Sequence, residues 1–209
     1  MKIALSKQEK YFAIATLSYS FLCLLFALAF PRGTEVEYIS SHYSNAVNLF
    51  FAYVTQLAET PGVIIFLAIV ILKDRKQVVH YTFIAIVTFL VITMFKFLLF
   101  DTTDRPRVWA LQQQLVLPVN TSDLLHHSFP SGHTAFSFCL MYCLVHLFEN
   151  NKGAFLFFIV GIFVGLSRIY LLAHFVIDTG IGAAIGLLIG IVGNRIYDHY
   201  LSPFFNRNR

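Results

Sequence analysis

The stretch "YFAIATLSYSFLCLLFALAF", residues 11–30, contains twenty residues and no charged side chain. A helix that crosses the hydrocarbon core of a bilayer needs about 20 apolar residues, so this stretch predicts a transmembrane helix. The whole chain agrees, because 57% of its 209 residues are hydrophobic and only 12% are charged. A soluble domain is about 45–50% apolar and about 25% charged. The composition therefore excludes an ordinary soluble domain.

Five further apolar runs follow the first along the chain. They cover about residues 48–72, 78–100, 133–148, 154–172 and 175–196. Together the six runs predict an all-α fold, a six-transmembrane-helix bundle, in a single domain over residues 1–209. Pro61 interrupts the second run and predicts a kink there, which neighbouring helices can tolerate.

The first run has an alternative interpretation as a secretory signal. Lys2, Lys7 and Lys10 precede the apolar stretch, and "ALA" at 27–29 is similar to a cleavage site. The apolar stretch is long for a signal, which favours a retained helix.

The basic residues are scattered through short segments between apolar runs, which argues against nucleic acid as a partner. The N-terminus, "KDRK" at 73–76 and the C-terminal tail with Arg207 and Arg209 are the basic segments. Residues 31–45 and 101–132 carry slightly more acid than base. Since basic segments stay in the cytoplasm, we expect both termini there and segment 101–132 on the outer side.

Two smaller patterns concern packing. Cys23, Cys139 and Cys143 all lie inside apolar runs, which indicates buried apolar side chains and no disulfide framework. In the last run, glycines recur every four residues, at 182, 186 and 190. This spacing places them on one helix face, where another helix can approach closely.

Three polar clusters interrupt the apolar pattern at the same predicted membrane face. They are "KFLLFDTTDRPR" at 96–107, "HHSFPSGH" at 126–133 and "SRIYLLAHFVID" at 167–178. Ionisable residues at membrane depth are costly and indicate a functional site. Each cluster alone has a structural alternative. Lys96 could extend to the interface, Ser131 could only cap a helix, and the His174–Asp178 pair could only tie two helices together.

The combination of clusters favours phosphoryl transfer. A Pro-Ser-Gly turn that opens a helix offers backbone N–H groups and a positive dipole end to an anion. His174 and Asp178 are four residues apart, so the carboxylate can orient the imidazole. Cations can neutralise the phosphate oxygens, while one histidine attacks phosphorus and another protonates the leaving oxygen.

The motifs "K…RP", "PSGH" and "SR…H…D", in this order, resemble the type 2 phosphatidic acid phosphatase (PAP2) family over about residues 48–196. The resemblance implies a metal-independent membrane phosphatase, with no cofactor, that hydrolyses a lipid phosphate or diphosphate through a phosphohistidine. It also implies that the active site lies at the outer membrane face of the bundle. The expected location is the bacterial inner membrane, with the site facing the periplasm.

The resemblance also implies a role for each motif residue. Lys96, Arg105 and Arg168 bind the phosphate, and Ser131 and Gly132 donate hydrogen bonds to it. His133 is the general acid, His174 the nucleophile and Asp178 its orienting partner. The segment between Lys96 and Arg105 is two residues longer than usual in the family, which a bulge or longer turn could absorb.

Phosphatidate, phosphatidylglycerol phosphate, undecaprenyl diphosphate and lipid A phosphates all fit this reading as substrates. The expected partners are the substrate lipid and the bilayer, with no obligatory protein partner evident. Three alternatives stay open: a lipid-to-lipid phosphotransferase, a non-enzymatic anionic-lipid binding or transport protein, and a metal site. The metal site would draw on His126, His127, His133, His174 and Asp178, but it leaves Arg105 and Arg168 without a task.

Overall fold

The computed structural model describes residues 5–118, 124–148 and 150–201, and within them it has helices and no strand. This confirms the predicted all-α class. The helices are α1 (Lys7–Ala29), α2 (Thr34–Ser41), α3 (Asn45–Val54), α4 (Thr60–Asp74), α5 (Val78–Met94), α6 (Pro106–Gln112), α7 (Gly132–Phe148), α8 (Asn151–Tyr170) and α9 (Val176–Ile196). Of the residues used to predict orientation, Lys2, Arg207 and Arg209 lie outside the described ranges.

Four stretches are long and apolar enough to cross a membrane: Lys7–Ala29, Thr60–Leu99, Asn151–Tyr170 and Val176–His199. The second of these contains both α4 and α5, and the chain folds back between them. Phe66 and Tyr81 are fifteen positions apart, which is about 22 Å along a straight helix, yet their ring centroids are 6.1 Å apart. Helix α7 is apolar but shorter, at 17 residues. That all six long helices cross the bilayer stays a prediction.

The predicted second span, 48–72, is wrong in its first half. Residues 45–58 form α3 and a short 3₁₀ turn, Thr55–Ala58, and Glu59 is extended before α4 begins at Thr60. Pro61 lies in the first turn of α4, where its missing N–H costs no hydrogen bond. The proline therefore starts a helix and does not kink one.

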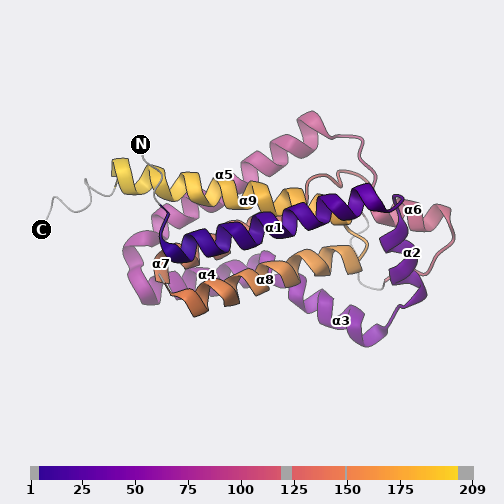
Figure 1. The fold of residues 1–209 in the computed structure, drawn as a ribbon, viewed down its shortest axis with the longest axis horizontal. Coiled ribbons are helices and arrows are strands. Elements are labelled where there is room, and N and C mark those ends of the chain that lie inside the picture. The colour runs from indigo at the N-terminus through magenta and orange to yellow at the C-terminus, as the bar shows by residue number, and fades with distance from the viewer. Residues whose placement is uncertain (1–4, 119–123, 149, 202–209) are drawn as a thin grey trace, which may run out of the picture.

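The structure adds two short helices, α2 and α6, that the apolar pattern did not predict. Figure 1 shows both at one end of the molecule, while α1 begins and α9 ends at the opposite end. The polar connections that carry the motifs lie toward the end with α2 and α6. The predicted position of the termini relative to the membrane stays a prediction.

Helix α9 packs against α7 through its glycine face, as predicted. A Cβ added to Gly182 would lie 2.5 Å from the Ser131 carbonyl oxygen, and one added to Gly186 would lie 2.0 Å from the Ala135 carbonyl oxygen. Real Cβ atoms do not approach oxygen so closely, so the two backbones meet only because these residues lack side chains. The contact holds Ser131 at the start of α7 against the helix that carries Asp178.

We expect Gly186→Ala to destabilise the protein, because the added methyl would push the α7 backbone away. Overpacking costs about 1–3 kcal/mol, or roughly 3–10 °C in Tm for a chain of this size. Gly153→Ala in α8 is the matched control, since its Cβ would meet only ordinary contacts, the nearest at 3.5 Å. Thermal unfolding in detergent would measure both, and equal Tm values for the two variants would contradict the packing argument.

Helix α1 is built into the bundle. Phe12 is 1% exposed in the core, and the Tyr19 hydroxyl lies 2.8 Å from the Thr179 hydroxyl of α9. Glu9 is also buried, and it accepts hydrogen bonds from Tyr142 and Arg195. A buried carboxylate is stable only with such partners. These contacts make α1 part of the packed bundle.

Candidate active site

A cavity of about 630 Å³ opens between the 3₁₀ turn, the end of α5, the start of α7 and the end of α8. Six of the eight predicted site residues line it: Lys96, Arg105, Gly132, His133, Arg168 and His174. Ser131 and Asp178 do not line the cavity, and their side chains are buried next to it. The structure thus brings together residues from three motifs that are separated along the chain.

The first two cations are positioned by the backbone of residues 126–127. The Lys96 Nζ donates to the His127 carbonyl oxygen at 2.9 Å, and the Arg105 Nε donates to the His126 carbonyl oxygen at 2.9 Å. Lys96 lies in a π-helical turn, Phe95–Leu99, which widens the end of α5 where the motif is two residues longer. Burial lowers the pKa of Arg105, but a guanidinium stays charged in proteins.

Arg168, at the end of α8, is 6% exposed. One terminal nitrogen donates to the Thr55 hydroxyl at 2.7 Å. Its buried Nε has no hydrogen-bond partner among the described residues. An unpaired buried donor is costly, so a cation held this way is prepared for an anionic ligand.

The start of α7 has the predicted capping geometry. The Ser131 Oγ accepts a hydrogen bond from the Thr134 N–H at 3.4 Å and lies 2.9 Å from the Thr134 hydroxyl. The Ser131 N–H donates to the Asp178 carbonyl oxygen at 3.0 Å. Ser131 therefore caps the helix in this structure. Its predicted hydrogen bond to phosphate stays a prediction.

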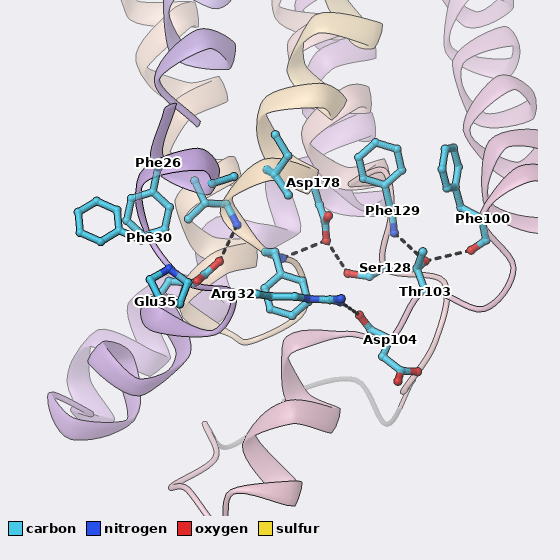
Figure 2. Close-up of a pocket in the computed structure, with 15 residues that line it drawn as sticks. Phe26, Phe30, Arg32, Glu35, Phe100, Thr103, Asp104, Ser128, Phe129 and Asp178 are labelled. Carbon is cyan, nitrogen blue, oxygen red and sulfur yellow. Dashed lines mark hydrogen bonds between the residues drawn. The ribbon is translucent and has the colours of Figure 1, made fainter. Parts of the chain in front are cut away.

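His174 and Asp178 lie together, but the carboxylate is held mainly by other groups. The Asp178 Oδ2 accepts from the Ser128 hydroxyl at 2.5 Å, as Figure 2 shows. It also accepts from the Phe175 N–H at 3.0 Å. The His174 Nδ1 is 3.5 Å from the same oxygen, and no hydrogen bond joins them. Ser128 was not predicted as a site residue, although it lies inside the motif segment 126–133.

His174 is suited to act as a nucleophile because its imidazole is neutral. The residue is 1% exposed, and three of the cations surround it. Burial, and then the positive charges of Lys96, Arg168 and Arg105, hold the pKa of His174 well below its usual range. A neutral imidazole keeps a lone pair with which to attack phosphorus.

His133 has a partner that the motif analysis missed. Its Nε2 lies 3.0 Å from the Glu59 Oε1, and the hydrogen bond lowers the pKa of Glu59, which is therefore ionised. The signal was present, since Glu59 is an ionisable residue inside the apolar run 48–72.

The remaining histidines lie at the rim. The His126 Nδ1 is 2.7 Å from the Asp104 carboxylate, and the His127 Nδ1 is 3.6 Å from that of Asp101. Across residues 5–118, 124–148 and 150–201, no three His, Cys, Asp or Glu side chains are grouped as a metal site requires.

Two further cavities adjoin the site. One, of about 470 Å³, shares Glu59, Lys96, Gly132 and His133 with the first and is otherwise mostly apolar; its walls include Val63, Ile64, Phe89, Ile92 and Phe136. The other, of about 380 Å³, lies on the side of Asp178 and Ser128 and is bordered by aromatic rings and by Arg32 (Figure 2). The mostly apolar cavity of about 470 Å³ provides a path from the cations toward the side of the bundle.

We expect Lys96→Ala to lower kcat/KM for phosphate release at least tenfold. Hydrogen bonds to charged groups contribute about 1.5–3 kcal/mol, or roughly 10- to 150-fold. Lys96→Arg should restore only part of the rate, because the two cations differ in shape. Steady-state kinetics on equal amounts of folded protein would check this. A loss below about threefold would correspond to the energy of a surface ion pair, about 0–1 kcal/mol. Lys96 would then only extend to the interface and would not bind the phosphate.

A family model described as the PAP2 superfamily matches residues 77–200. The undecaprenyl-diphosphatase BcrC of Bacillus subtilis (strain 168) is 25% identical over 167 residues, which cover 78% of this chain and 81% of that protein. The crystal structure of Aquifex aeolicus LpxE is similar in fold, with a TM-score of 0.67 at 23% identity over 79% of this chain and 96% of that one. A transmembrane PAP2 type phosphatidylglycerolphosphate phosphatase from Bacillus subtilis gives a TM-score of 0.53 at 21% identity, over 93% and 98% of the two chains.

Proposed function

The chain belongs to the PAP2 superfamily, and we propose that it is an integral-membrane phosphatase that hydrolyses a lipid phosphate or diphosphate through a phosphohistidine at His174. One observation carries the proposal: the buried imidazole of His174 shares a cavity with three cations, Lys96, Arg105 and Arg168. Binding an anion would need the cations alone. A neutral, buried histidine beside them adds a nucleophile.

The proposed reaction has two steps. In the first, a His174 ring nitrogen forms a bond to phosphorus while the bond to the leaving oxygen breaks, and His133 gives that oxygen a proton. The cations hold the non-bridging oxygens, whose charge is spread in the transition state. In the second step water attacks phosphorus, its proton passes to His133, and the N–P bond breaks to release phosphate and regenerate both histidines.

Asp178 acts on His174 through a carboxylate that is held beside the imidazole ring. Its carboxylate is fixed by the Ser128 hydroxyl and the Phe175 N–H, and it faces the imidazole at 3.5 Å. A carboxylate at this distance favours the positive charge that develops on the ring during attack. Ser128 is thereby proposed as part of the same unit.

The apolar cavity beside the cations supports a lipid as substrate. A phosphate held by Lys96, Arg105 and Arg168 would leave its tail next to Val63, Ile64 and Phe89, at the side of the bundle. The relatives act, by their names, on undecaprenyl diphosphate and on phosphatidylglycerol phosphate. Among the candidates we place undecaprenyl diphosphate first, because that relative matches in sequence over 78% of this chain.

A phosphate-release panel tests this function. Purified protein would be mixed with phosphatidate, phosphatidylglycerol phosphate, undecaprenyl diphosphate and a lipid A phosphate, with and without chelator. We expect release from at least one lipid, unchanged by chelator. Loss of release with chelator would instead indicate a metal, and transfer of labelled phosphate to a second lipid would indicate a phosphotransferase. Lipid binding without release from any of the four would favour a binding or transport protein.

The proposed orientation places both termini in the cytoplasm and the cavity on the outer side. A reporter fused after Arg209 should read cytoplasmic. A Cys in place of Gln112, an exposed residue at the end of α6, should react with an impermeant reagent added from outside. The three native cysteines are buried and give little background. Thr121, in the same predicted outer segment, lies outside the described residues. Labelling only after permeabilisation would invert the topology.

A further inference from the structure

The His133 imidazole has a carboxylate partner that belongs to none of the three motifs. Glu59 is 74 positions away in the chain, and its Oε1 lies 3.0 Å from the His133 Nε2. The two side chains are 45% and 30% exposed, and both line the catalytic cavity and the apolar cavity beside it. The pair therefore stands where the phosphate end and the tail end of a bound lipid would meet.

The backbone holds Glu59 in a fixed place. Its N–H donates to the Gln56 carbonyl oxygen at 3.0 Å, and its own carbonyl oxygen accepts from Val63 at 3.0 Å. A Cβ on Gly62 would lie 2.0 Å from the Leu57 carbonyl oxygen, so the turn into α4 is too tight for any larger residue there. This turn, with Pro61 in the first turn of α4, directs the chain so that Glu59 reaches His133.

The charges around His133 make the carboxylate important. Among the described residues that line the catalytic cavity, Lys96, Arg105 and Arg168 are cations and Glu59 is the one acid. The three cations repel any further positive charge in the cavity, so they disfavour protonation of the His133 imidazole. A general acid must carry a proton before it can give one to the leaving oxygen.

We propose that Glu59 is a positioning residue for His133, which holds one ring nitrogen and stabilises the imidazolium so that the other nitrogen delivers its proton to the leaving oxygen. This inference rests on the proposed phosphatase function. Glu59 stays a carboxylate throughout. The proton leaves His133 as the P–O bond breaks, and His133 regains a proton from water when the phosphohistidine is hydrolysed.

The role predicts a dependence on the leaving group. An alkoxide is a poor leaving group and needs the proton, whereas a nitrophenolate leaves readily without it. Loss of Glu59 should therefore slow an alkyl phosphate far more than a nitrophenyl phosphate. A pair that merely ties α4 to α7 would lower both rates together.

The test compares an alkyl phosphate with an alkyl-substituted nitrophenyl phosphate of the same chain length, so that both carry a tail. Glu59→Gln should lower the first-turnover rate on the alkyl phosphate at least tenfold, which is part of the roughly 10²–10⁴ that a general acid contributes. The first-turnover rate of nitrophenolate release from the nitrophenyl ester should stay within about threefold of wild type. Glu59→Asp should restore part of the loss. In the first turnover, His133→Ala should show the same dependence on leaving group, and the double variant should be no slower than His133→Ala alone.

Glu37→Gln is the matched control, because it removes a carboxylate from an exposed position on α2 and should leave both rates unchanged. Equal losses on both esters with Glu59→Gln, no loss on either, or a double variant with additive losses would each overturn the role of Glu59. A wild-type protein that released phosphate from neither ester would overturn the phosphatase function itself, and the role of Glu59 with it.

Discussion

His174→Ala is expected to abolish phosphate release while the protein stays folded and inserted in the membrane. Without the imidazole no covalent intermediate can form, and the remaining cations can only bind the substrate. Loss of a nucleophile typically costs at least about 10³-fold in rate, even when the rest of the site is intact. His174 lies in the loop between α8 and α9, outside both helices. Release of inorganic phosphate from the preferred lipid is the measurement.

Two controls accompany this variant. Elution in detergent and thermal unfolding would confirm that His174→Ala is folded. Asp178→Asn should lose less activity, since the imidazole remains, and Ser128→Ala should lose less again, because the Phe175 N–H still holds the carboxylate. A His174→Ala protein that kept more than a few per cent of the wild-type rate would remove this residue from the nucleophilic role.

Arg168→Ala is expected to have the second largest effect. The guanidinium is 6% exposed, and one of its donors has no partner within the described part of the chain. Two charged hydrogen bonds to phosphate, at about 1.5–3 kcal/mol each, give a loss of roughly 10²- to 10⁴-fold in kcat/KM. Arg168→Lys should recover little, because an ammonium cannot form the paired contact.

Thr55→Val is the matched control for Arg168. It removes the hydroxyl that accepts from the guanidinium at 2.7 Å but leaves the charge in place. The expected loss is small, about 10-fold or less, as for one hydrogen bond. If Arg168→Ala and Thr55→Val had the same small effect on kcat/KM, Arg168 would be a structural residue that does not contact the phosphate.

The sequence predicted the helices and the motif residues, because both depend on local patterns. Apolar runs gave the positions of α1, α5, α7, α8 and α9 to within a few residues. The second run gave a wrong prediction, a single kinked span, because residues 48–72 look like one apolar stretch with a proline inside. Whether Pro61 kinks a helix or begins one depends on the 3₁₀ turn before it and on the tight contact of Gly62 with Leu57. A periodic pattern does not contain that contact.

The contacts between site residues were harder to predict than the identities of the residues themselves. The pairing of Glu59 with His133 joins positions 74 residues apart, and that of Ser128 with Asp178 joins positions 50 apart. Spacing in one sequence carries no information about such contacts. The prediction that the Asp178 carboxylate orients the His174 imidazole rested on their separation of four residues. In the structure α9 begins at Val176, after His174, so the two side chains do not share a regular helix face.

The most direct test of the account is to trap the phosphoenzyme. His133→Ala would be mixed rapidly with a labelled nitrophenyl phosphate that carries an alkyl tail, because this substrate needs no proton for the first step and the variant lacks the base for the second. The reaction would be stopped in alkaline detergent, and the digested peptides would be analysed for phosphate. We expect a burst of one nitrophenolate per chain, with an equal amount of acid-labile phosphate on His174. Phosphate on any other residue, or nitrophenolate release with none on the protein, would contradict it.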